Sequence, residues 1–114
     1  MSVADGLPVS LLAPAHLEQA TALAATFKLL GDPTRLRIVL RCLDAPRSVG
    51  DVALELGLSQ SLVSQHLRLL RSARLVVGIR KAKRVSYEVS DDHIRTVLVQ
   101  IIVHVSEAVV DTEG

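Results

Sequence analysis

The sequence has few of the residues on which many small proteins depend: one cysteine, one tyrosine, one phenylalanine and no tryptophan among 114 residues. A single cysteine excludes an intrachain disulfide, a CxxC redox centre and a zinc site built from several thiolates of one chain. Because aromatic side chains are so scarce, any core is aliphatic. No apolar run approaches the roughly 18 residues of a membrane helix, and the N-terminus lacks the basic flank of a signal peptide. We therefore expect a cytoplasmic protein without a membrane partner.

The length of the chain predicts one domain, because 114 residues are too few for two independent cores. Residues 1–14 mix Gly, Pro and Ser with short apolar stretches, so we expect a flexible N-terminal arm there. One folded domain follows over residues 15–110, with a short tail at 111–114. A small aliphatic domain can gain stability by burying surface between subunits, which favours an oligomer.

Charge is distributed unevenly, although 13 Lys and Arg nearly balance 12 Asp and Glu. Residues 60–87 include seven basic residues and no acidic one, whereas residues 88–114 include six acidic residues and one basic residue. This asymmetry indicates two surfaces with different partners. The alternative is an ordinary solvated charged face.

Residues 15–73 carry four helical patterns, over 15–30, 33–43, 49–56 and 60–73. Their expected start and stop residues are Gly31, Asp32 with Pro33, the capping-box-like pair Ser48 and Asp51, Gly57, and Ser59. The expected buried face of the second helix is Leu36, Val39, Leu40 and Leu43. The short connection Gly57-Leu58-Ser59 between the last two helices predicts a helix-turn-helix.

The hydrophobic period then changes from that of a helix to that of strands. Two β-branched runs, at residues 75–79 and 85–89, flank the basic sequence RKAKR at 80–84, which predicts a hairpin with a basic tip. Ser90-Asp91-Asp92 caps a final helix that runs to about Val110. The predicted fold is mainly α with a β-hairpin, a winged helix-turn-helix.

The fourth helix is the expected DNA-reading element. Its small polar residues gather near the N-terminal end, where glutamine can pair with adenine and serine can read several base edges. Basic residues around it and on the hairpin would hold phosphates. The candidate DNA-binding residues are Gln60, Ser61, Ser64, Gln65, His66, Arg68, Arg80, Lys81, Lys83 and Arg84. The alternative is a winged helix that binds protein, which would show no salt-dependent DNA binding.

Two segments resemble the ArsR/SmtB family of metal-responsive repressors: FKLLGDPTRLRI at 27–38, and LSQSLVSQHLRLLR at 58–71 with the following RLV at 74–76. The resemblance extends over residues 23–107. It implies a homodimer formed through the first and last helices, which binds an inverted-repeat operator in double-stranded DNA without metal and is released by its inducer. It also implies that the regulated genes serve metal efflux or sequestration.

The family's thiolate metal site lies where this chain has Ser48-Val49-Gly50 in place of cysteines. Arsenic, cadmium and lead prefer sulfur ligands, so this departure argues against sensing of those ions. The lone Cys42 is interpreted as a small buried hydrophobic residue, and His16 as a surface residue rather than an additional ligand.

Four residues of the last helix, Asp91, His93, His104 and Glu107, resemble the zinc site of the SmtB-type sensors. His104 and Glu107 are three residues apart and share a face, but His93 lies about 16 Å from His104 along the helix axis. One helix cannot bring all four to one metal, whereas two antiparallel copies can, with two sites per dimer. Two imidazoles and two carboxylates suit Zn(II), with Co(II) as a surrogate.

The resemblance further implies that the non-ligating nitrogen of His104 hydrogen-bonds a backbone carbonyl near Arg74, which links the metal site to the DNA-reading helix. Zinc is then expected to favour a dimer whose helix spacing is wrong for DNA. The alternative is a constitutive DNA-binding protein, or one with another inducer, in which the four residues are interface polar groups. Because no nucleophile–base pair, phosphate loop or catalytic acid pair is present, we expect neither enzymatic activity nor a small-molecule substrate.

Overall fold

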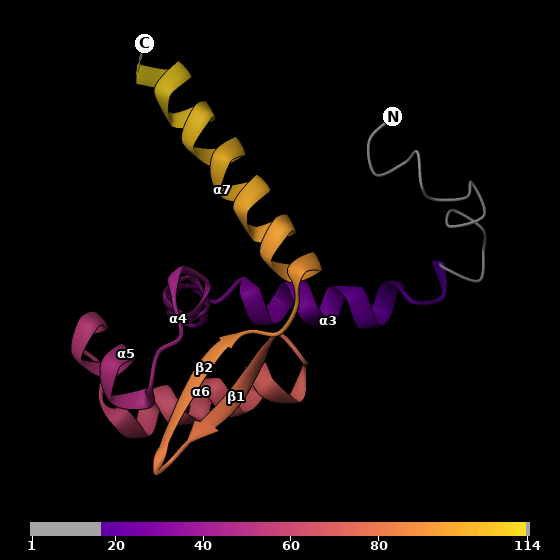
Figure 1. Ribbon diagram of the computed structural model, residues 1–114. Helices are drawn as coiled ribbons and strands as arrows, with labels where there is room; N and C mark the ends of the chain where they lie inside the picture. The colour runs from indigo at the N-terminus through magenta and orange to yellow at the C-terminus, as the bar shows by residue number, and fades with distance from the viewer. Residues whose placement is uncertain (1–16, 114) are drawn as a thin grey trace.

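The computed structural model describes residues 17–113, with side chains to residue 108. The predicted arm at 1–14 and His16 lie outside the described residues. The elements in chain order are α3 (Ala20–Leu30), α4 (Pro33–Asp44), α5 (Val49–Leu56), α6 (Gln60–Ser72), β1 (Val76–Lys81), β2 (Arg84–Val89) and α7 (Asp92–Glu113). Figure 1 shows α4, α5, α6 and the hairpin gathered together, while α7 extends away from them.

The helix boundaries follow from local hydrogen bonds at their N-terminal ends. The Asp32 carboxylate accepts a hydrogen bond from the Arg35 amide at 2.9 Å, with Pro33 in the first turn. Ser48 and Asp51 form a reciprocal capping box, each side chain accepting from the other's backbone N–H at 3.0 Å. Ser59 caps α6 through the Leu62 amide at 3.1 Å. These predicted caps are confirmed.

The helix-turn-helix depends on Gly57, which ends α5 in the left-handed conformation at φ 68°. A side chain there would be strained by the backbone, although the surrounding space is open. Gly50, inside α5, has ordinary helical geometry, and an added Cβ would lie 3.7 Å from the Gln60 side-chain nitrogen. The two glycines therefore form a matched pair for mutation.

We expect Gly57→Ala to lower the free energy of unfolding by about 1 kcal/mol, because alanine resists positive φ. Gly50→Ala should raise it by a few tenths of a kcal/mol, because alanine favours the helix. Urea denaturation followed by circular dichroism measures both changes. Equal effects of the two substitutions would show that backbone conformation at Gly57 is not the cause.

The hairpin is antiparallel and longer than predicted. Its ladder runs from the Val76–Val89 pair to the Lys81–Arg84 pair, which leaves Ala82 and Lys83 as the turn. The sequence pattern had placed all of residues 80–84 in the tip, and that boundary was wrong. A two-residue turn suits paired strands, and Ala82 adopts the positive φ of 56° that such a turn uses.

The core is aliphatic, as predicted. Its buried residues are Ile38, Val39, Cys42, Leu43, Val52, Ala53, Val63, Leu67, Leu70, Leu75, Val76, Val89 and Leu98. Cys42 is fully buried, and burial raises the pKa of its thiol to about 11, so the thiol is protonated at neutral pH. This agrees with its interpretation as a small hydrophobic residue.

The predicted buried face of α4 was partly wrong. Ile38 and Cys42 are buried, whereas Leu36 and Leu40 are half-buried beside α7. Those two leucines line an apolar groove of about 250 Å³ together with α7 residues that include Leu98. Because α4 is apolar over a wide arc, tertiary packing decides which part of the arc faces the core.

Helices α3 and α7 leave large apolar side chains in solvent. Leu23 and Phe27 of α3 are 55% and 62% exposed. Among the described side chains of α7, Leu98 is buried, and the large apolar ones that are exposed are Val97, Val99, Ile101, Ile102, Val103 and Val105. A helix that is apolar on most sides needs further burial, so both helices favour contact with another surface. Within the described residues, no helix is long and apolar enough to span a membrane.

Candidate nucleic-acid interface and metal site

The N-terminal half of α6 presents the predicted polar face. Gln60, Ser61 and Gln65 are exposed and Ser64 is half-buried, while Val63 anchors the other side of the helix in the core. The Ser59 hydroxyl accepts a hydrogen bond from the Leu62 amide and so caps α6. Gln60 is therefore the first residue of the helix, and its side chain is exposed. This arrangement leaves the predicted base-reading groups available at one end of the helix.

His66 sits deeper on α6 than the other DNA-binding candidates. Its ring is half-buried, and Nδ1 is inaccessible and has no hydrogen-bond partner in the described part of the chain. A buried ring nitrogen cannot reach DNA, so any contact that this ring makes with DNA has to use Nε2. Arg68, two residues further along, is exposed.

The hairpin carries four exposed basic residues, but they differ in their contacts. Lys81 and Lys83 extend from its tip, and Arg80 lies one position earlier on β1. Arg84 instead turns back to α5, where its Nη2 lies 2.6 Å from Asp51 Oδ2 and donates to Ser48 Oγ at 3.2 Å. The sequence pattern did not predict this ion pair, because its two partners are far apart in the chain.

Asp51 has a strongly shifted carboxyl group. The Ser48 backbone N–H and the Arg84 guanidinium hold the pKa of Asp51 well below its usual range, at about 2. The carboxylate therefore stays charged at neutral pH. Since the pKa is lowered in the folded protein, the contribution of this carboxylate to stability is present above pH about 4 and is lost as pH falls towards 2.

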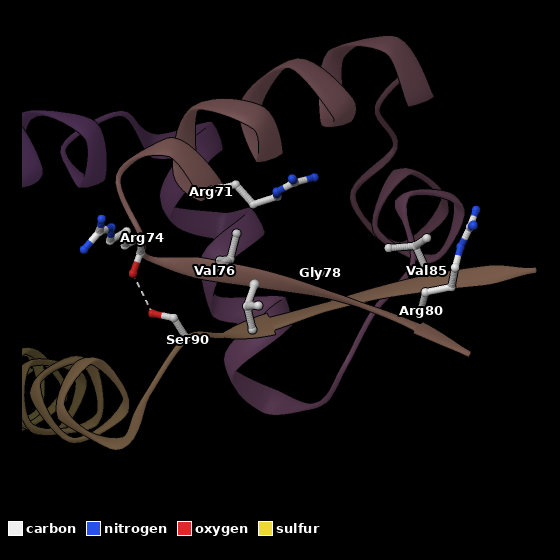
Figure 2. A pocket seen from close by; sticks show the side chains of 8 residues that line it. Arg71, Arg74, Val76, Gly78, Arg80, Val85 and Ser90 are labelled. Carbon is white, nitrogen blue, oxygen red and sulfur yellow. Dashed lines mark hydrogen bonds between the residues drawn. The ribbon is translucent and has the colours of Figure 1, made fainter. Parts of the chain in front are cut away.

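Three arginines line a hollow of about 460 Å³ between the end of α6 and the hairpin. Figure 2 shows Arg71 and Arg74 near the α6–β1 turn and Arg80 further along the hairpin. Arg71 was not among the predicted DNA-binding residues, although it belongs to the same acid-free block as Arg68. Its place beside the hairpin makes it a further basic residue of this surface.

Arg74 occupies the turn that joins α6 to β1, at the left-handed φ of 61°. Its carbonyl accepts a hydrogen bond of 2.6 Å from the Ser90 hydroxyl, as Figure 2 shows. The Ser90 amide also donates to the Leu75 carbonyl at 3.1 Å. Ser90 therefore joins the end of α6 to the start of α7, a connection that the sequence pattern did not predict.

The four predicted metal ligands lie in two exposed pairs, one at the start of α7 and one further along it. Asp91 precedes the helix, and its Oδ1 accepts from the Ile94 amide at 2.9 Å and lies 3.7 Å from His93 Nδ1. The His93 side chain is 96% exposed. His104 and Glu107 are also exposed, further along α7. Among the described residues of one chain, no three His, Cys, Asp or Glu side chains come together as a metal site.

Comparison with known proteins places the chain in a family. Residues 32–77 match the family described as "Bacterial regulatory protein, arsR family". The chain is 37% identical over 92 residues to the HTH-type transcriptional regulator NmtR of Mycobacterium tuberculosis, which covers 81% of this chain and 77% of that protein. The chain belongs to the arsR family.

Two further comparisons support this membership. The Transcriptional repressor SmtB homolog of Synechocystis is 36% identical over 92 residues, covering 81% of this chain and 70% of that protein. The solution structure of the cadmium metal-sensor CMTR from Mycobacterium tuberculosis is similar at a TM-score of 0.62 and 38% identity, covering 69% of this chain and 82% of that one.

The predicted winged helix-turn-helix and family are confirmed. The arsR family consists of DNA-binding transcriptional regulators rather than enzymes.

Proposed function

We propose that this arsR-family protein is a zinc-responsive transcriptional repressor. Its zinc-free homodimer binds an inverted-repeat operator, and Zn(II) bound between the two α7 helices lowers its affinity for DNA. Genes for metal efflux or sequestration are then expressed. The observation that carries this proposal is the placing of two exposed ligand pairs, Asp91 with His93 and His104 with Glu107, on a helix with exposed apolar sides.

The homodimer is supported by the exposed apolar side chains of α3 and α7. Val97 lies between the two ligand pairs on the same helical stripe, and it is 52% exposed in one copy. Packing two antiparallel α7 helices would bury such residues and at the same time bring Asp91 and His93 of one copy towards His104 and Glu107 of the other. By two-fold symmetry, the dimer then has two equivalent sites.

DNA binding is assigned to α6 and the hairpin. The polar N-terminal end of α6 enters the major groove, where Gln60, Ser61, Ser64 and Gln65 meet base edges. Arg68, Arg80, Lys81 and Lys83 are assigned to phosphates, and His66 to a supporting position on the same helix. Two copies held together by α7 present two such helices to successive major grooves.

The donor chemistry of the proposed ligands favours zinc. Two imidazoles and two carboxylates form a tetrahedral nitrogen–oxygen set that suits Zn(II), with Co(II) as a spectroscopic surrogate. Cadmium prefers thiolates, and Cys42 is buried and protonated. Sensing of cadmium by this chain is therefore not part of the proposal, although the fold is similar to that of a cadmium metal-sensor.

Coupling between the two sites is assigned to the contacts around Arg74. Ser90, which directly precedes Asp91, donates its hydroxyl to the Arg74 carbonyl at the end of α6. A change in how α7 is held is thus passed by backbone and hydrogen bonds to the DNA-reading helix. The hydrogen bond from His104 to a carbonyl near Arg74 that the resemblance implies remains part of this proposal.

A mixing experiment tests whether each site is shared between two chains. Asp91→Ala/His93→Ala and His104→Ala/Glu107→Ala variants should each lose the tetrahedral absorption of bound Co(II). Unfolding and refolding the two variants together produces heterodimers, in which one site regains all four ligands. We expect absorption to return at one site per heterodimer.

A control with each double variant refolded alone should show no recovery. If mixing restores nothing although heterodimers form, the four residues do not make a site between subunits. The chain would then be a constitutive DNA-binding member of the family, or one with another inducer. The hydrogen bond from Ile94 to Asp91 supports that second candidate, because it gives Asp91 a structural role as a helix cap.

A further inference from the structure

One basic residue of the hairpin, although exposed, is held by contacts with another element. Arg84 Nη2 contacts Asp51 Oδ2 at 2.6 Å and Ser48 Oγ at 3.2 Å. These are the same two oxygens that form the capping box at the start of α5, where each accepts a backbone N–H at 3.0 Å. A single guanidinium therefore joins the hairpin to the capped N-terminal end of α5.

The link lies at the end of β2 next to the turn, away from the end of the hairpin where Val76 and Val89 are buried in the core. Further along the strand, Tyr87 exchanges two backbone hydrogen bonds with Arg47, at 3.0 and 2.7 Å. This attachment and the buried Val76–Val89 pair both hold the part of the hairpin that lies away from the turn. Arg84, paired with Lys81 next to the turn, supplies a second point and thereby sets the direction of the hairpin relative to α5.

The energetics indicate that the link positions the hairpin more than it stabilises the fold. The Arg84 and Asp51 side chains are 63% and 39% exposed, and ion pairs in such surroundings contribute little to stability. Asp51 nevertheless stays ionised at neutral pH, because the capping box and the guanidinium both favour its charged form. The contact is therefore intact under the conditions in which DNA is bound.

We propose that Arg84 and Asp51 are positioning residues of the DNA interface: their ion pair holds the hairpin tip where Lys81 and Lys83 meet phosphates, and Arg84 itself contacts no phosphate. This inference rests on the proposed DNA binding. It replaces the sequence-based assignment of Arg84 to phosphate with a role inside the protein. It also gives a function to an acidic residue on the DNA-binding side of the molecule.

Whether Asp51→Asn weakens or tightens DNA binding tests the proposal. Removing a negative charge near a polyanion ordinarily strengthens binding, so Asp51→Asn should tighten DNA binding if Asp51 only repels phosphate. The proposal predicts the opposite, a weakening of about three- to fivefold, the equivalent of a surface ion pair. Asparagine keeps an oxygen that can accept from the Ser48 amide, so the cap of α5 is retained.

Arg84→Ala should weaken binding by the same factor, and the double variant should be no weaker than either single variant. Lys83→Ala is the matched control at the turn. It should reduce the slope of log K against log salt concentration by about 0.9 for each phosphate that the lysine neutralises. Arg84→Ala should leave that slope unchanged, because the lysines still reach phosphates in the complex and only the entropic cost of ordering the hairpin tip rises. The double substitution Asp51→Arg with Arg84→Asp should restore part of the affinity.

The hairpin can also be examined in the homodimer without DNA. The heteronuclear NOE of the Lys83 amide should fall in Arg84→Ala and in Asp51→Asn, while thermal unfolding changes little. Tighter DNA binding by Asp51→Asn, a smaller salt slope for Arg84→Ala, or an unchanged NOE in both variants would each overturn the proposal. Absence of salt-dependent DNA binding by the wild type would instead refute the proposed function, and the NOE would still report on the link.

Discussion

Val97→Asp is expected to convert the dimer to a monomer and to weaken binding to a two-half-site operator by a factor on the order of 10²–10⁴. Val97 is 52% exposed in one copy and lies between the two proposed ligand pairs of α7. In an antiparallel dimer, two aspartates near the symmetry axis would repel each other and bury unpaired charge. The large effect on DNA binding follows because the second half-site is then bound by an unlinked chain.

Analytical ultracentrifugation and fluorescence anisotropy measure the two parts of this prediction. Val97→Leu is the conservative control and should remain dimeric with nearly wild-type affinity. A fragment with one half-site distinguishes loss of dimerisation from loss of folding, because its weak binding should change little. A Val97→Asp variant that stays dimeric and binds the full operator would contradict the role of α7 as the dimer contact.

His104→Ala is expected to produce a repressor that zinc no longer releases. In the wild type, zinc should lower DNA affinity by roughly 5- to 150-fold, the range that corresponds to coupling free energies of 1–3 kcal/mol. In the variant, zinc should lower DNA affinity by less than about twofold. DNA binding without zinc is retained, because His104 is exposed on α7 and is not among the residues assigned to DNA. Anisotropy titrations with and without zinc measure both states.

Two further variants separate a metal ligand from an ordinary helix residue. Gln100→Ala, at an exposed polar position of the same helix, should keep the zinc response. Asp91→Asn should keep the helix cap, since asparagine is a good N-cap, but should weaken zinc binding because an amide is a poorer ligand. A full zinc response in His104→Ala would show that His104 is not a ligand of the regulatory metal.

Features that depend on neighbouring residues could be predicted from the sequence. The caps at Asp32, Ser48 and Ser59 and the left-handed Gly57 involve groups within a few residues of each other, and all four are confirmed. Their spacing was sufficient to predict the helix-turn-helix. The same holds for the existence of the hairpin, whose alternating β-branched residues are local.

Features that depend on residues distant in the chain could not be predicted in this way. The limits of the hairpin were missed because Arg80, Lys81 and Arg84 pair across the strands, and cross-strand register does not show in either run separately. The Arg84–Asp51 link joins residues 33 positions apart. The buried side of α4 was partly misassigned, because Leu36 and Leu40 line a groove between α4 and α7 that one chain leaves open, while Ile38 and Cys42 face the core.

The same distinction between local and long-range features applies to the candidate site. The polar end of α6 and the basic hairpin lie on the surface as their local patterns indicated. The role of Ser90 was missed because its partner, the Arg74 carbonyl, lies 16 positions earlier. The proposed metal site requires a second chain, so neither the sequence nor one copy of the fold brings its four ligands together.

Control of DNA binding by zinc is tested most directly by a reversible zinc titration of the protein on a promoter fragment, followed by fluorescence anisotropy. We expect the labelled DNA to be released as about one zinc per chain is added, and a chelator to restore the complex. Tight, salt-dependent binding that is unchanged by zinc would contradict this expectation.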